Sequence, residues 1–153
     1  MHKTQNSGKE KYSPLKIVLV FLTILVFDQM TKYLFATRTI TIIPKIADLT
    51  PTTNTGSAFG VLQWMPNTFY IILSAMILAV GLALLKKGKI PPMITILFMA
   101  GVAGNMIDRT IYGYVRDFIT ISIWPSFNIA DSVMVISVVL FIIKTARSKE
   151  QNI

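Results

Sequence analysis

The sequence predicts a mainly α-helical integral membrane protein, with a bundle of four transmembrane helices and a small extracytoplasmic β-sheet. Hydrophobic residues make up 53% of the 153 residues and charged residues only 14%, an unusual balance for a water-soluble domain. Four apolar stretches approach the roughly 20 residues that a helix needs to cross a bilayer. Positively charged residues border these stretches, and their distribution gives the orientation.

The four expected spans form one domain over residues 1–153. The first begins like a signal peptide but continues into DQMTKYLF without a small-residue cleavage site, so we expect it to be retained. The other three are separated by stretches rich in proline, glycine and charged residues. The spans cover about residues 17–35, 68–85, 92–111 and 127–143.

Ten of the fifteen lysines and arginines lie before the first span, between the second and third, or after the fourth. Cytoplasmic loops carry such an excess of cations, so both termini are predicted to be cytoplasmic and residues 36–66 and 112–126 to face outward. A nucleic-acid-binding protein is not expected, because these clusters are short and border apolar spans. The ten are Lys3, Lys9, Lys11, Lys16, Lys86, Lys87, Lys89, Lys144, Arg147 and Lys149.

Two outer stretches alternate apolar and polar residues with a period of two. They are TITII at 39–43 and ITISI at 119–123. This period is typical of half-buried strands, so we expect a small sheet on the outer surface.

Polar side chains from three of the four spans reach a common depth. At about 1.5 Å of rise per residue, each falls in the outer half of a hydrocarbon core about 30 Å thick. Ionisable groups inside a membrane are costly and usually functional. The sequence therefore predicts a polar layer under the outer interface, formed by Asp28, Lys32, Asn105, Asp108 and Asp131.

Any hydrolytic chemistry of this layer must come from groups other than cysteine and histidine. The chain has no cysteine, and its only histidine, His2, lies in a polar tail, which excludes thiol nucleophiles and Ser-His triads. If the return after Asp117 folds back toward Asp131, two close carboxylates would share a proton and supply an acid and a base. Two structural alternatives stay open: Asp131 could cap the last helix with Asn128, and Asp117 could pair with an arginine, Arg109 or Arg116.

The other polar residues also have structural interpretations. Asp28 and Lys32 are spaced i, i+4, as in a neutralising ion pair. Asp108 and Arg109 could neutralise each other and end the third span. Asn54 and Gly56 could form a turn.

Five ordered blocks together resemble the lipoprotein signal peptidases, the type II signal peptidases of bacteria. The blocks resemble the family patterns DQxTK, NxGxAFG, GNxIDR, VxDF and FNxADS. In this chain they read DQMTK (28–32), NTGSAFG (54–60), AGNMIDR (103–109), VRDF (115–118) and FNIADS (127–132).

The resemblance implies an aspartic endopeptidase of the bacterial cytoplasmic membrane, with its active site near the outer face. Such an enzyme removes the signal peptide of a prolipoprotein by cutting before a diacylglyceryl-modified cysteine. The resemblance implies that Asp117 and Asp131 form the catalytic pair and that the enzyme needs no cofactor or metal. It also implies that the enzyme lies among membrane lipids and binds globomycin-like inhibitors. We expect a monomer. Its implied substrate-binding or supporting residues are Asp28, Lys32, Asn54, Gly56, Asn105, Asp108, Arg109, Asn128 and Ala130.

Three other classes of protein remain as alternatives. A small four-helix membrane transporter also carries ionisable groups in its spans, although transporters usually place them where both sides gain access. A metal-dependent membrane hydrolase could use the clustered carboxylates as Mg²⁺ or Mn²⁺ ligands. A non-catalytic assembly subunit would need none of them for activity.

Overall fold

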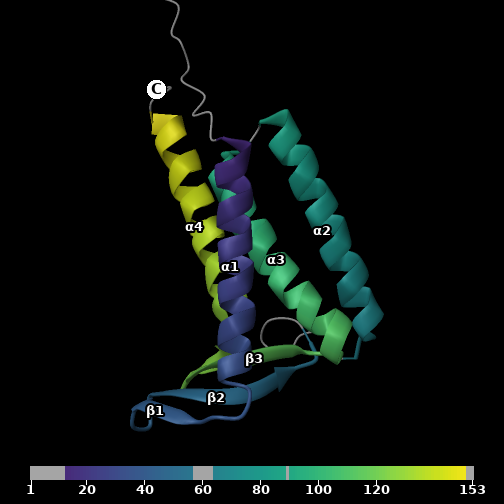
Figure 1. The fold of residues 1–153 in the computed structure, drawn as a ribbon. Helices are drawn as coiled ribbons and strands as arrows, with labels where there is room; N and C mark the ends of the chain where they lie inside the picture. Colours follow the sequence, from purple (N-terminus) through teal and green to yellow (C-terminus); the bar gives the residue numbers. More distant parts are fainter. Residues whose placement is uncertain (1–12, 57–63, 89, 151–153) are drawn as a thin grey trace, which may run out of the picture.

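The computed structural model describes residues 13–56, 64–88 and 90–150. Four long helices stand side by side and a sheet lies across one end of them (Figure 1). All four helices are long and apolar enough to cross a membrane, and the sheet is open and antiparallel, so the predicted fold class is confirmed. The helices are α1 (Pro14–Leu34), α2 (Asn67–Lys87), α3 (Pro92–Tyr112) and α4 (Ile129–Glu150).

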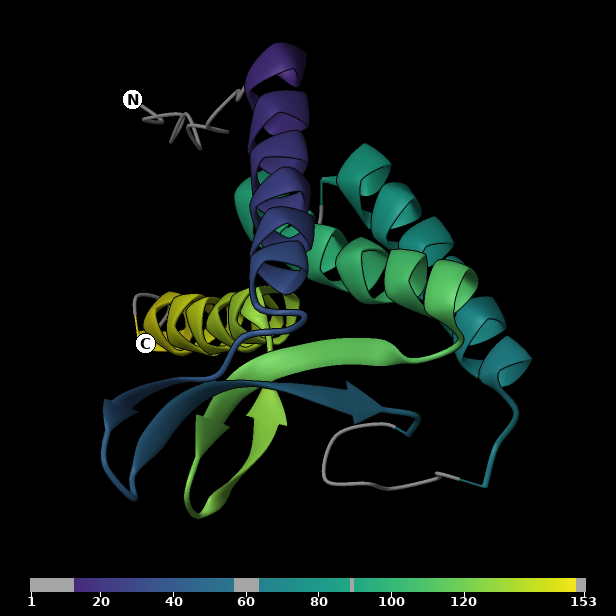
Figure 2. The ribbon, with the colours of Figure 1, turned by 60° about the horizontal axis from the view of Figure 1, so that its bottom comes forward.

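The sheet has four strands in the order β1-β2-β3-β4, each antiparallel to its neighbour. Two hairpins, β1–β2 and β3–β4, therefore lie next to each other, and their ends extend past the helices (Figures 1 and 2). The strands are β1 (Ile40–Ile43), β2 (Ala47–Asn54), β3 (Val115–Ile121) and β4 (Trp124–Phe127).

Helix α3 forms the centre of the bundle. In its span 61% of the residues are buried inside the protein, against 11–17% in the other three helices, which leaves their remaining surface for lipid. Small residues allow this close packing. A Cβ atom on Gly101 would lie 2.5 Å from the carbonyl oxygen of Ala130 in α4, and one on Gly104 would lie 2.7 Å from Asp28 Oδ2 in α1.

The turn at the end of α3 connects the bundle to the sheet. Gly113 has φ 84°, a left-handed conformation that suits glycine, and its amide bonds the carbonyl of Arg109. The chain then enters β3 at Val115. This short connection keeps the start of β3 at the end of α3.

Several predicted boundaries differ from the structure, and two of them lie near the polar residues. The fourth helix begins at Ile129 rather than 127, because Phe127 ends β4 and Asn128 caps the helix. The strand predicted at 119–123 belongs to β3, which starts at Val115 and ends at Ile121 before a turn at residues 122–123. Residues 57–60 of the NTGSAFG block lie outside the described residues, as do the predicted cytoplasmic cations Lys3, Lys9, Lys11 and Lys89.

Candidate active site

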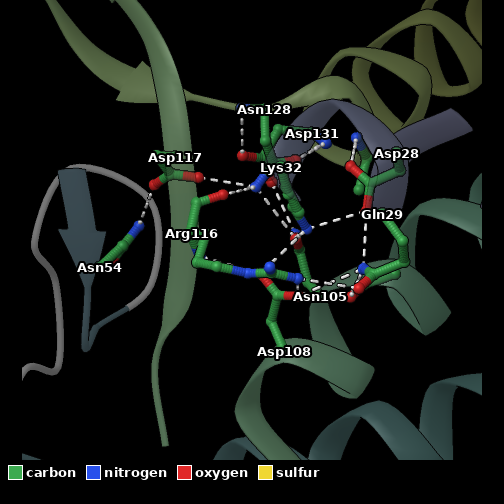
Figure 3. A network of polar contacts seen from close by, with 12 residues as sticks. Asp28, Gln29, Lys32, Asn54, Asn105, Asp108, Arg116, Asp117, Asn128 and Asp131 are labelled. Atoms are coloured by element: carbon green, nitrogen blue, oxygen red, sulfur yellow. Dashed lines mark hydrogen bonds and ion pairs between the residues drawn. The ribbon is translucent and has the colours of Figure 1, made fainter. Parts of the chain in front are cut away.

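Asp117 and Asp131 reach the same site from different elements, and Asn128 lies between them (Figure 3). Asp117 lies on β3 and is 2% exposed. The side-chain amide of Asn128 donates to Asp117 Oδ1 at 2.6 Å, and the amide of Asn54, at the end of β2, donates to Asp117 Oδ2 at 3.2 Å. Both oxygens of this carboxylate are therefore held by neutral amide groups.

Asp131 lies in the first turn of α4, within a capping box. The backbone amide of Asn128 donates to Asp131 Oδ2 at 3.2 Å, and the amide of Asp131 donates to Asn128 Oδ1 at 2.9 Å. Asn105 in α3 donates to Asp131 Oδ1 at 2.8 Å. The capping interpretation of Asp131 is therefore right. It is also compatible with catalysis, since the same Asn128 that caps the helix holds Asp117.

The surroundings of Asp117 favour its protonated form. Burial, and then the nearby charge of Asp131, raise the pKa of Asp117 from 3.8 to about 7, although the hydrogen bonds from Asn54 and Asn128 act in the opposite direction. Among the described residues neither Arg109 nor Arg116 forms an ion pair with Asp117, so that alternative is wrong. A carboxyl with this pKa exchanges its proton near neutral pH.

A buried ionic cluster lies behind this pair, toward α1 and α3 (Figure 3). Lys32 is 1% exposed, and its Nζ lies 2.9 Å from Asp28 Oδ2, 3.3 Å from Asp108 Oδ2 and 3.0 Å from Asn105 Oδ1. The predicted Asp28–Lys32 ion pair is confirmed. Because Asn105 Oδ1 accepts from Lys32, its amide nitrogen points to Asp131.

The sequence interpretation missed two members of this cluster, Gln29 and Arg116. Arg116 Nη2 donates to Asp108 Oδ1 at 2.7 Å and to Gln29 Oε1 at 2.9 Å, and Gln29 Nε2 donates to both Asp28 and Asp108. Asp108 is therefore neutralised by Arg116 and Lys32 rather than by Arg109. The sequence feature that could have identified them is their position next to Asp117 and Asp28 in the VRDF and DQMTK blocks.

Arg109 and the Asn54–Gly56 turn form another wall of the site. The amide of Gly56 donates to Asn54 Oδ1 at 3.0 Å, so the predicted turn is present, and Arg109 Nη2 donates to the carbonyl of Gly56 at 2.5 Å. The Arg109 guanidinium also lies 4.8 Å from the centre of the Tyr70 ring. Its Nε is buried and has no hydrogen-bond partner in the part of the chain that the structure describes.

Ala130 contributes through its backbone. Its side chain is fully buried, and its amide donates to Asp28 Oδ1 at 2.8 Å. The start of α4, which carries Asp131, is thereby tied to α1. Every predicted site residue thus lies in the Asp117–Asp131 site, the ionic cluster or the Arg109 wall.

A cavity of about 860 Å³ opens beside these residues. Asp117 and Asp131 both line it, together with Asn54 and Arg109. Apolar residues of α2 and α4 line part of it, including Leu73, Ile77, Met134 and Val135. The cavity is large enough for several residues of an extended peptide. Both carboxylates line the same cavity as these apolar side chains.

Comparison with known proteins identifies the family. The family model described as "Signal peptidase (SPase) II" matches residues 20–147. The chain belongs to the signal peptidase II family. It is 37% identical to the lipoprotein signal peptidase of Thermodesulfovibrio yellowstonii, over 85% of this chain and 93% of that protein. It is 36% identical to that of Staphylococcus haemolyticus, over 93% of this chain and 99% of the relative.

Solved structures agree with this membership of the signal peptidase II family. A bacterial membrane enzyme solved by the in meso method at 2.3 Å resolution superposes with a TM-score of 0.83 and 33% identity, over 92% of this chain and 93% of that chain. The family consists of proteases that remove signal peptides from prolipoproteins. The chain is therefore a membrane-embedded protease, and the transporter and assembly-subunit alternatives are set aside.

Proposed function

We propose that this signal peptidase II uses Asp117 and Asp131 to activate water and cuts a bacterial prolipoprotein before its diacylglyceryl-modified cysteine. One observation carries the proposal: Asn128 hydrogen-bonds both carboxylates, at 2.6 Å to Asp117 and through the capping box to Asp131, beside a large cavity. Two acids fixed by one residue can act on the same water and the same carbonyl.

The proposed reaction needs one proton shared between the two aspartates. The ionised carboxylate takes a proton from water as the water oxygen attacks the scissile carbonyl carbon, and the protonated partner hydrogen-bonds the carbonyl oxygen. The tetrahedral intermediate collapses as the C–N bond breaks and a proton passes to the leaving amine. The raised pKa of Asp117, about 7, supports a pair that holds one proton at neutral pH.

Arg109 and the cavity wall are suited to holding the substrate. Among residues 13–56, 64–88 and 90–150, the buried Nε of Arg109 has no hydrogen-bond partner, and a peptide carbonyl in the cavity would accept its hydrogen bond. The apolar side chains of α2 and α4 would contact the lipid of the modified cysteine and the apolar signal peptide. A globomycin-like cyclic peptide would compete for the same space.

We also propose that the site faces the outer side of the cytoplasmic membrane and that both termini are cytoplasmic. Lys86 and Lys87 end α2, and Lys144 and Arg147 lie in the last turns of α4, at the end of the bundle away from the sheet. An excess of cations marks the cytoplasmic side of a membrane protein. We propose that the chain acts as a monomer, because both aspartates come from one chain.

The test is cleavage of a synthetic diacylglyceryl prolipopeptide by the purified, detergent-solubilised protein. Asp117→Asn and Asp131→Asn should each remove activity while the melting temperature shows that the protein is folded. Asp48→Asn is the matched control, since Asp48 lies on β2 and is not among the residues that line the cavity. Normal cleavage by either variant of the proposed pair would refute the mechanism.

A further inference from the structure

The hairpin ends of the sheet expose an unusual amount of apolar surface. Ile123, in the turn between β3 and β4, is 92% exposed, and β1 is exposed along its whole length. We call this the hairpin-tip surface, formed by Ile40, Ile43, Ile46 and Ile123, all of which are among the exposed large hydrophobic residues. An apolar surface of this kind on a small sheet requires a partner.

The strand register places apolar and polar side chains on opposite faces of the sheet. Directly paired residues share a face. Ile40 pairs with Leu49, Leu49 with Ile119, and Ile119 with Phe127, so one row is wholly apolar. The next row, Thr41 with Asp48 and Asp48 with Thr120, is wholly polar. The hairpin ends of the sheet are therefore amphipathic.

The apolar face is also the face that carries the active site. Side chains alternate along β3, so Asp117 and Val115 lie on the same face as Ile119 and Ile121. Val115, Asp117 and Trp124 line the cavity between the sheet and helices α2 and α4. At the start of β3 both faces of the sheet contact the bundle, since Arg116 and Phe118 on the opposite face reach Asp108 in α3 and Phe35 after α1. Farther along, the hairpins extend past the helices (Figures 1 and 2), and there the apolar row continues to the exposed Ile40.

The connections between helices and strands fix the height of the sheet. A helix of 21 residues, such as α3, is about 31 Å long, close to the hydrocarbon thickness of a bilayer. Only residues 113–114 separate α3 from β3, and only Asn128 separates β4 from α4. At about 3.6 Å per residue, these strand ends lie within about 11 Å of the helix ends, in the interfacial layer.

The positions of exposed aromatic and cationic side chains also indicate that this end of the bundle lies in the interfacial layer. Tyr33 in the last turn of α1 is 76% exposed, and Trp64, shortly before α2, is 75% exposed. Exposed tyrosine and tryptophan gather at the membrane–water interface. Arg38 and Lys45, both exposed beside β1, are placed to reach lipid phosphates.

We propose that the hairpin-tip surface inserts into the phospholipid leaflet on the side of the sheet, with its isoleucines below the headgroups. Continuity with the lipid-facing helices favours lipid over a protein partner, since the hairpins overhang the bundle at the height of the headgroups. This insertion would hold the sheet, and with it Asp117, at a fixed depth. It does not depend on the proposed reaction, because an inactive enzyme would insert in the same way.

The test uses single cysteines, which the chain's lack of native cysteine allows. Ile40→Cys and Ile123→Cys are labelled with the fluorophore NBD, and the full-length protein is placed in nanodiscs with or without lipids that carry a doxyl quencher below the headgroup. Thr41→Cys is the matched control, adjacent on β1 but on the polar face. The melting temperature of each labelled protein confirms folding.

We expect blue-shifted emission and loss of most fluorescence with the quencher at positions 40 and 123, and little change at position 41. Equal quenching at positions 40 and 41, or none at 40 and 123, would overturn the proposal. A blue shift at positions 40 and 123 that depends on protein concentration, without quenching, would also overturn the proposal. It would indicate a second copy of the chain on this surface.

Discussion

The electrostatic role assigned to Asn54 can be tested by its effect on pH dependence. If Asp117 and Asp131 act with one shared proton, activity falls on the alkaline side as that proton is lost, near the Asp117 pKa of about 7. Asn54 donates to Asp117 Oδ2 and so favours the ionised form. Removing this donor should raise the pKa and move the alkaline limit to higher pH.

The size of the shift follows from the hydrogen bond. A hydrogen bond to a charged group contributes about 1.5–3 kcal/mol, and the 3.2 Å length of this one argues for the lower end. At about 1.36 kcal/mol per pKa unit, the loss corresponds to about one unit. Asn54→Leu is the suitable change, because leucine is similar in size and leaves little room for a water molecule to replace the amide.

The assay is cleavage of the diacylglyceryl prolipopeptide over a range of pH, with kcat and KM determined separately at each value. Asn54→Leu should move the alkaline limit of kcat from near pH 7 to near pH 8. Thr52→Val is the control, since Thr52 Oγ1 donates to the backbone carbonyl of Asp117 and not to its carboxylate. An unchanged limit in Asn54→Leu, a shift to lower pH, or an equal shift in Thr52→Val would refute the reasoning.

Two further predictions concern stability, measured by thermal melting in detergent. Lys32→Met should destabilise the protein by about 3–5 kcal/mol, because it leaves the buried Asp28 and Asp108 with one cation fewer; an unchanged melting temperature would contradict the assigned network. Gly101→Ala should cost about 1–3 kcal/mol, since its Cβ would meet the carbonyl of Ala130, whereas a melting temperature equal to that of the native chain would show that α3 and α4 are not in close contact.

The helices and the common level of their polar groups along the bundle were predictable because both follow from local sequence. Apolar length fixes a span, and a constant rise per residue fixes the depth of Asp28, Asn105 and Asp131. The five sequence blocks that resemble the family patterns also contain every predicted site residue. The contacts between these residues were not predictable, because they depend on how helices far apart in the sequence pack.

Strand β2 and the two missed cluster residues show where local reasoning fails. The sequence of β2, ADLTPTTN, contains Pro51 and no apolar alternation, and it becomes a strand because β1 and β3 pair with its two edges. From the sequence, Arg116 was a possible ion-pair partner for its neighbour Asp117. Adjacent residues on a strand point to opposite faces, so the Arg116 side chain reaches Asp108 instead.

The type of partner separates the four aspartates of the active site and the ionic cluster into two pairs. Asp28 and Asp108 are bonded by cations, Lys32 and Arg116, and two negative charges balance two positive ones. Asp117 and Asp131 are instead held by amides, from Asn54, Asn105 and Asn128. A cation in direct contact would fix a carboxylate in its ionised form, whereas an amide orients it and leaves its proton available. The neutral cluster therefore positions Asn105 without adding net charge beside the pair, and Asp117 is the carboxyl whose pKa of about 7 allows proton exchange near neutral pH.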